Sequence, residues 1–122
     1  TLLGGSAADI ITGSSEADTI QGAGSGDTLN GGAGGDEIRG GSGRDIIIGG
    51  SGADSLYGGN QNDQFVIDAR GSTGPGEVID GGGGSGDNIV VAVSFGTANF
   101  IFTAISGVEI LEYRAGGPGG FQ

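Results

Sequence analysis

The chain has 122 residues, of which 32 are glycine, and it contains no Cys and no His. Fifteen acidic residues against four arginines give a formal net charge of −11, which disfavours nucleic acid as a partner and favours cations. Without His, Cys or Lys there is neither an imidazole or thiolate ligand for zinc nor an ordinary base for a nucleophilic serine, so we predict that the chain is not an enzyme.

From Gly4 to Val66 the chain repeats every nine residues, most clearly in the lines GGAGGDEIR, GGSGRDIII and GGSGADSLY. Every line has Asp at position six and a large apolar residue at position eight. A fixed short period predicts a solenoid in which each repeat buries its apolar side chain against its neighbours. The position-six residues are Asp9, Asp18, Asp27, Asp36, Asp45, Asp54 and Asp63. The position-eight residues are Ile11, Ile20, Leu29, Ile38, Ile47, Leu56 and Phe65.

Within one line, six glycine-rich residues predict a tight turn, and three residues with an apolar centre predict a very short strand. Two lines then form one flat coil of eighteen residues, whose strand centres point inward. We therefore predict an all-β fold, a parallel β-roll with two nonapeptides per coil. The predicted core is Ile20, Leu29, Ile38, Ile47 and Leu56.

Alternate lines fall on opposite edges of such a roll. One edge would carry Asp9, Asp27, Asp45 and Asp63, and the other Asp18, Asp36 and Asp54. Carboxylates stacked about 4.8 Å apart repel one another by roughly 1 kcal/mol per pair in water, and by more in a less polar medium. Oxygen ligands alone favour a hard cation, and Ca²⁺ tolerates irregular oxygen cages better than Mg²⁺. We expect one Ca²⁺ ion in each interval between successive aspartates of an edge. There are three such intervals on one edge and two on the other, which predicts about five Ca²⁺ ions.

The lines resemble the glycine-rich nonapeptide GGxGxDxUx of the RTX (repeats-in-toxin) family, from about Gly4 to Val90. The resemblance implies that calcium is held by the position-six carboxylates and by turn carbonyls, which here include those of Gly32, Gly34, Gly41, Gly43, Gly50 and Gly52. A single Gly-Asp turn is better explained as a solvated loop, but seven in register are not. The end turns depart from the pattern at Ala7, Ser14, Glu16, Gln61 and Asn62, so we expect their sites to be weaker.

After Phe65 the register breaks, and Gly and Pro residues predict an inserted loop at about 67–76. Glu77 then stands where Asp is expected, with Ile79 inward, and Asp87 with Ile89 restores the pattern, so the ions could number up to seven. We assign residues 1–90 to the roll. Residues 91–122 are predicted to form C-terminal capping strands, of the kind RTX proteins often carry, and a flexible tail.

The outward positions seven and nine of one face include Ile46, Ile48 and Val66, which would form an apolar patch on a wet surface. We predict that this face packs on another subunit or on the chain's own C-terminal strands.

Two function classes remain open. The first is a self-assembling structural protein of the bacterial cell exterior, of the adhesin, surface-layer or filament type. The second is a passive module that calcium folds and that assists secretion of a larger toxin, protease or lipase. Both are calcium-binding and secreted, and no run of apolar residues predicts a membrane span.

Overall fold

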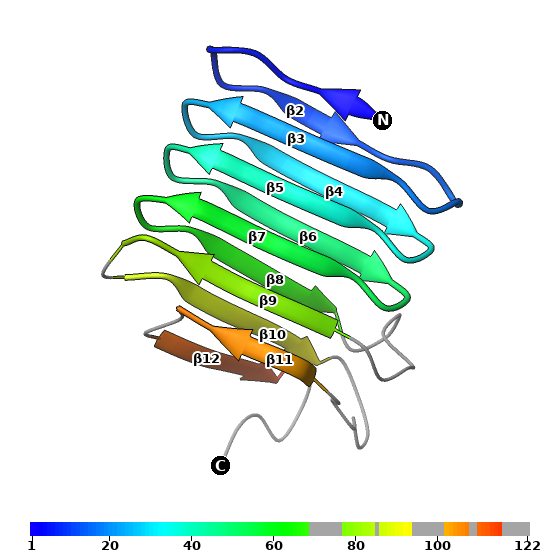
Figure 1. Cartoon of the computed structure of the whole chain (residues 1–122). Coiled ribbons are helices and arrows are strands. Elements are labelled where there is room, and N and C mark those ends of the chain that lie inside the picture. The colour runs from blue at the N-terminus through cyan, green and yellow to red at the C-terminus, as the bar shows by residue number, and fades with distance from the viewer. Residues whose placement is uncertain (69–76, 85, 94–101, 108–109, 116–122) are drawn as a thin grey trace.

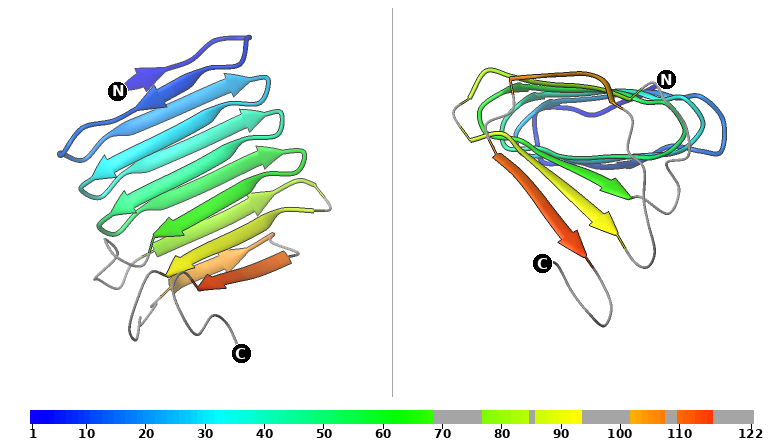
Figure 2. Two further views of the ribbon diagram at one scale, coloured as in Figure 1. Left: turned by 180° about the vertical axis from the view of Figure 1, so that it is seen from behind. Right: turned by 90° about the horizontal axis from the view of Figure 1, so that it is seen from below.

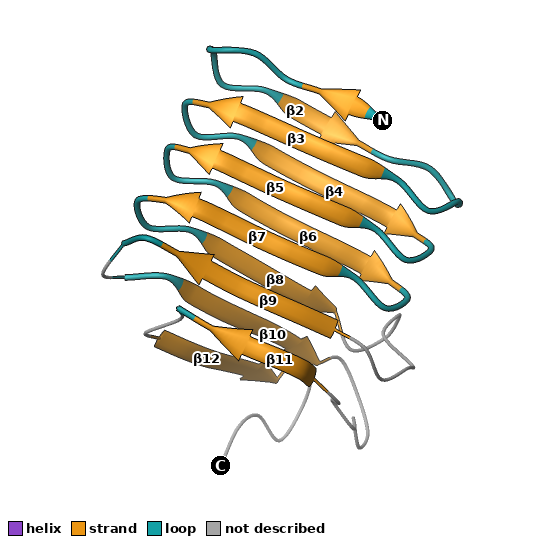
Figure 3. Cartoon of the chain, viewed as in Figure 1, coloured by secondary structure: helices purple, strands orange, loops and turns teal. Residues whose placement is uncertain are grey.

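A computed structural model gives the fold of the chain and describes residues 1–68, 77–84, 86–93, 102–107 and 110–115. In this part the strands form two six-stranded parallel sheets that face one another, and the chain alternates between them (Figures 1 and 3). The first sheet contains β1 (Leu2–Leu3), β3 (Thr19–Gly24), β5 (Glu37–Ser42), β7 (Ser55–Asn60), β9 (Glu77–Gly82) and β11 (Phe102–Ser106). The second contains β2 (Ile10–Thr12), β4 (Thr28–Ala33), β6 (Ile46–Ser51), β8 (Gln64–Asp68), β10 (Asn88–Val93) and β12 (Ile110–Ala115).

Successive coils stack in register, so that each residue pairs with the residue one coil further along the chain. Ile20 pairs with Ile38, and Ile38 in turn pairs with Leu56. Viewed along the stack, the sheets and turns outline a flattened coil (Figure 2). The predicted all-β parallel β-roll is therefore confirmed.

The strands are longer than the sequence predicts. The strands β3 to β7 each span six residues rather than three, because they continue through the first three residues of the next nonapeptide. Glycines of neighbouring coils pair with one another there, as Gly41 does with Gly59. The prediction of a six-residue turn was wrong before β4 to β8, because these glycine backbones take part in the parallel ladder and only three residues remain as a turn. In the first coil, six residues do separate β1 from β2 and β2 from β3.

The core is one column of apolar side chains between the two sheets. Its fully buried members are Ile20, Leu29, Ile38, Ile47, Leu56, Phe65 and Ile79. Ile11 is only partly buried, because the first coil has a neighbour on one side only. The side chain of Ile89 lies outside the described residues.

The C-terminal strands extend the roll rather than cover a face. β11 pairs with β9 and β12 pairs with β10, both in parallel. The idea that these strands pack over Ile46 and Ile48 is therefore wrong for the described residues, since they continue the edges of the sheets. The inserted loop lies outside the described residues, apart from its first two positions, which belong to β8.

Candidate metal centres

Each position-six aspartate lies immediately before a strand, and the structure gathers these residues into two columns. After the first aspartate of each column, the Oδ1 atom of every carboxylate accepts a hydrogen bond from the backbone N–H of the aspartate one coil earlier. On one edge these bonds join Asp9 to Asp27, Asp27 to Asp45, Asp45 to Asp63 and Asp63 to Asp87, at 2.7–2.9 Å. On the other edge they join Asp18 to Asp36 and Asp36 to Asp54, at 2.8 and 2.9 Å.

The two residues after the register break take the places that the sequence predicts. Asp87 joins the first column although it lies 24 residues after Asp63 rather than 18. Val78 N–H donates to the Asp54 carbonyl, as position seven does in each coil after the first, which places Glu77 at position six. Only the backbone of Glu77 is described.

The second carboxylate oxygen is the unusual feature of the inner turns. The Oδ2 atom is buried and accepts no hydrogen bond within the described part of the chain in Asp27, Asp36, Asp45, Asp54 and Asp63. These five side chains are at most 2% exposed. A buried anionic oxygen without a partner is costly, because it has lost its water and gained nothing in exchange. A bound cation or a proton would therefore stabilise each of these Oδ2 atoms.

The pKa values of four of these aspartates are raised, which also disfavours the charged carboxylate. Burial raises the pKa of Asp36, Asp45 and Asp54, and the N–H bond that each accepts offsets only part of that effect. Burial raises the pKa of Asp63 to about 7, to which the neighbouring charges of Asp45 and Asp87 contribute. The fold thus holds several carboxyl groups in an environment that disfavours their charged form.

The glycine at position one forms a cradle for each Oδ2 atom. A Cβ atom added to Gly40 would collide with Oδ2 of Asp45 and would lie 2.6 Å from the carbonyl oxygen of Gly58. Gly22, Gly31 and Gly58 have equivalent surroundings, with the carbonyl oxygen at 2.7 Å. An orphaned carboxylate oxygen and a carbonyl oxygen therefore face the same small space, with no donor between them.

These position-one carbonyls were missed in the sequence analysis, which considered only positions two and four. The signal was present, because position one is glycine in every line, including the degenerate ones. Positions two and four instead admit Ala23, Ser25 and Gln61, each of which adopts a positive φ, at 90°, 74° and 74°.

The glycines at positions two and four, whose carbonyl oxygens are predicted calcium ligands, share one backbone conformation. Gly32, Gly34, Gly41, Gly43, Gly50 and Gly52 all have positive φ, between 97° and 125°. Their carbonyl oxygens face the same positions of the next coil, where Gly32 O meets Gly50 and Gly34 O meets Gly52. The Gly59 carbonyl at position two already accepts a 2.6 Å bond from Gly83 N–H. Calcium ligation by the carbonyl oxygens of the six predicted glycines remains a prediction.

The two N-terminal turns are built differently. Gly5 N–H donates to Oδ2 of Asp9 at 2.7 Å, and Ser14 donates to Oδ2 of Asp18 through its N–H at 2.6 Å and its hydroxyl at 2.9 Å. These bonds lower the pKa of Asp18. Both carboxylates are also more exposed than those of the inner coils. The Oδ2 atoms of the first coil therefore already have partners.

The donor set of the inner turns fits Ca²⁺. It consists of carboxylate and carbonyl oxygens, which are the ligands that this hard cation prefers. Among the described residues no three carboxylates converge on one point, so each interval offers two carboxylates and must draw its other ligands from the backbone or from water. The fitting intervals are Asp27/Asp45, Asp45/Asp63, Asp36/Asp54 and Asp63/Asp87.

The model of the RTX calcium-binding nonapeptide repeat family, which represents four copies of the repeat, matches residues 3–38 and 31–65. No curated protein and no solved structure matches the chain. Within the described residues, no helix is long and apolar enough to cross a membrane. The register, the parallel β-roll and the match over more than half of its length together show that the chain belongs to the RTX calcium-binding nonapeptide repeat family.

Proposed function

We propose that this chain is an extracellular structural module that calcium folds and that assembles with other subunits, as an adhesin, surface-layer or filament component does. The observation that carries the calcium part is the set of buried Oδ2 atoms without partners in Asp27, Asp36, Asp45, Asp54 and Asp63. A Ca²⁺ ion in each interval supplies the missing partner and removes the repulsion within the column.

The inner intervals are the strong sites in this proposal. The two N-terminal intervals, Asp9/Asp27 and Asp18/Asp36, are weaker, because one carboxylate of each already accepts a bond from its own turn. Affinities in the range of extracellular calcium modules, about 10⁻⁴ to 10⁻³ M, would keep the chain unfolded in a low-calcium cytoplasm and fold it outside the cell.

Calcium titration monitored by circular dichroism tests this part. We expect little β signal in calcium-free buffer and a cooperative rise on addition of Ca²⁺, because one thin apolar column does not offset the chain entropy and the carboxylate repulsion. Mg²⁺ at the same concentration serves as the control and should produce less folding. A full β signal that chelator does not change would contradict the proposal.

The assembly part rests on the outer face of the second sheet. Ile10 and Ile46 point away from the core and are 85% and 39% exposed, while Ile48 and Val66 beside them are half-buried. Five bound ions would also reduce the net charge from −11 to −1, which lowers the repulsion between copies. We therefore expect the calcium-loaded chain to self-associate through this face.

Sedimentation in excess calcium decides between the two function classes. The wild type should form oligomers, and the Ile10→Asn/Ile46→Asn variant should dissociate into monomers. Gln21→Asn/Ser55→Asn on the opposite sheet is the matched control and should behave as the wild type. If the wild type is already monomeric, the assembly part fails, and the chain is better explained as a passive folding and secretion module of a larger protein.

A further inference from the structure

Asn30 is followed by Gly31, and this is the one Asn-Gly pair in the sequence. The other asparagines precede Gln, Asp, Ile or Phe, whose side chains crowd the backbone nitrogen that follows the asparagine. Glycine has no side chain, so its nitrogen can reach a neighbouring carbonyl carbon without hindrance. The side-chain amide of Asn30 is therefore the one that cyclises most easily in this chain.

The reaction open to this pair is loss of the side-chain amide. The backbone nitrogen of Gly31 attacks Cγ of Asn30, the bond between Cγ and Nδ2 breaks, and the amide proton of Gly31 leaves with the released ammonia. The product is a succinimide ring, which water opens at one of its two carbonyl carbons. Opening at Cγ gives aspartate. Opening at the backbone carbonyl carbon gives isoaspartate, in which the main chain runs through the former side chain.

The folded roll holds Asn30 away from the geometry that this ring requires. Asn30 lies within β4, where it pairs with Thr12 on one side and with Ile48 on the other. In an extended strand the next backbone nitrogen points away from the side chain, so ring closure requires rotation about the Cα–C bond of Asn30. That rotation would also move the Asn30 carbonyl oxygen, which accepts a 2.7 Å bond from Gly13 N–H.

The side-chain amide is held in place as well. Oδ1 of Asn30 accepts a 3.1 Å bond from Gly32 N–H, and the residue is half-buried. The restraint on the backbone comes from the coils before and after, through Thr12 and Ile48. Separation of the coils releases it, so only the unfolded or locally open chain can form the ring.

Isoaspartate at position 30 would disturb a calcium site, because it adds a methylene group to the main chain directly before Gly31. A Cβ atom added to Gly31 already collides with Oδ2 of Asp36 and lies 2.7 Å from the Gly49 carbonyl oxygen, so this cradle has no room for extra atoms. The longer main chain would also shift Gly32 out of register with Gly50. Aspartate keeps the original main chain, and its carboxylate can still accept the bond from Gly32.

We propose that Asn30-Gly31 is a self-modification site that calcium protects. Without calcium, the unfolded chain converts Asn30 to isoaspartate, and the product no longer folds when calcium returns. The proposal rests on the proposed folding by calcium, since calcium is what keeps β4 paired. A chain left without calcium therefore loses its ability to refold gradually rather than at once.

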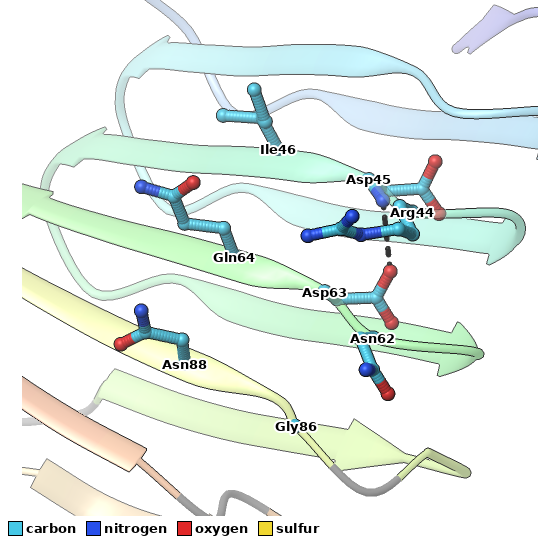
Figure 4. Close-up of a pocket in the computed structure, with 8 residues that line it drawn as sticks. All are labelled: Arg44, Asp45, Ile46, Asn62, Asp63, Gln64, Gly86 and Asn88. Carbon is cyan, nitrogen blue, oxygen red and sulfur yellow. Dashed lines mark hydrogen bonds between the residues drawn. The ribbon is translucent and has the colours of Figure 1, made fainter.

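Incubation of the chain at pH 8 with saturating calcium or with chelator tests the proposal, and mass spectrometry of peptide fragments follows each asparagine. We expect Asn30 to lose its amide at least about tenfold more slowly in calcium, because only the locally open fraction reacts. Asn62, in the turn before β8, and Asn88, in β10, are controls within the same molecule (Figure 4). Both should keep their amides in the two samples.

The effect on folding is measured on the incubated chain. After incubation with chelator, calcium titration monitored by circular dichroism should lose amplitude in proportion to the isoaspartate at position 30. Asn30→Asp carries the other product from the start and should fold at a calcium midpoint within about twofold of the wild type, since the change lies on the surface. Asn30→Gln, which would have to form a larger ring, should keep its amplitude through the same incubation.

Three outcomes would overturn the proposal. Equal loss of the Asn30 amide in the folded and the unfolded chain would exclude protection by the fold. Full recovery of the β signal by a chain that carries isoaspartate would exclude the effect on folding. The same loss of amplitude in Asn30→Gln as in the wild type would place the damage elsewhere. If Asn30→Gln does not fold, the fragment analysis of the wild type still identifies the modified residue.

A failure of calcium binding has a different readout. If chelator leaves the β signal unchanged, the proposed function fails, and guanidinium chloride replaces chelator as the means of unfolding. Loss of the Asn30 amide only in the guanidinium sample would then support the site and its protection by the fold. An intact amide in that sample would overturn the site itself.

Discussion

The backbone N–H of Asp45 donates a 2.9 Å hydrogen bond to Oδ1 of Asp63, while Oδ2 of Asp63 is buried without a partner. One carboxylate oxygen thus joins two coils of the backbone, and the other is left for an ion or a proton. The roles of the two oxygens can be tested separately by replacing an aspartate with asparagine. The amide oxygen of asparagine can still accept the hydrogen bond that Oδ1 accepts, but the negative charge available to an ion at Oδ2 is lost.

Replacement of Asp45 by Asn uses this difference. The amide oxygen can still accept the 2.8 Å bond from Asp27 N–H, but the anionic ligand shared by two intervals is lost. We expect the calcium midpoint for folding to rise roughly threefold to tenfold, since affinity follows ligand charge. The control is Asp9→Asn, which removes a half-buried carboxylate already bonded to Gly5 N–H and should change the midpoint little. Equal effects of the two changes would argue against the inner sites.

Acidification in the absence of calcium should favour folding. Asp63 has a pKa of about 7 in the folded chain against an ordinary aspartate pKa of 3.8, so its contribution to stability is fully present below about pH 3.8 and is lost as the pH rises through 7. Asp36, Asp45 and Asp54 change in the same direction. Circular dichroism of calcium-free protein from pH 8 to pH 4 should show increasing β signal, and Asp63→Asn should reduce the change. A falling signal would contradict the raised pKa values.

Calcium and protons should compete for the same oxygens. At pH 5.5 the calcium midpoint should lie above its value at pH 7.5, because a protonated carboxyl group must lose its proton to bind the ion. Isothermal calorimetry in two buffers of different ionisation enthalpy would measure the protons released. If binding releases no proton at a pH below 7 at which circular dichroism shows the calcium-free chain to be folded, Asp63 is not among the ligands.

Alanine at position one should be far more harmful than alanine at a solvated turn position. In Gly40→Ala the new methyl group meets Oδ2 of Asp45 and the Gly58 carbonyl, whereas in Gly5→Ala it meets nothing within 4 Å. We expect a loss of about 3 kcal/mol for the first and less than about 0.5 for the second, from denaturant unfolding in saturating calcium. A well-tolerated Gly40→Ala would show that the cradle is not needed.

Glycine at position 61 should stabilise the roll. Gln61 has a φ of +74°, which costs a residue with a Cβ atom about 1–2 kcal/mol, and glycine returns part of this through its greater freedom when unfolded. Gln61→Gly should therefore gain about 0.5–1 kcal/mol. Asn60→Gly, one position earlier and without positive φ, is the matched control and should be destabilising. The same sign for both variants would contradict the assigned strain.

The amino-acid sequence by itself determined the register, the core column and the two aspartate columns. Each follows from a period of nine, in which Asp45 and Ile47 recur at fixed distance from their counterparts, so the arrangement of one coil holds for the next. Glycine-rich turns and alternating strand side chains are local properties, and they are readable without the fold.

Only the tertiary structure decided which oxygen of each carboxylate is already bonded and which is left without a partner. It also decided that the strands run through the glycines and that Asp9 and Asp18 of the first coil accept hydrogen bonds from their own turns. The reason is physical: apart from the local bonds at Asp9 and Asp18, these features depend on hydrogen bonds and contacts between coils, made by residues 18 to 24 positions apart. A repeat pattern brings such residues together, but the packed backbone selects the atoms that meet.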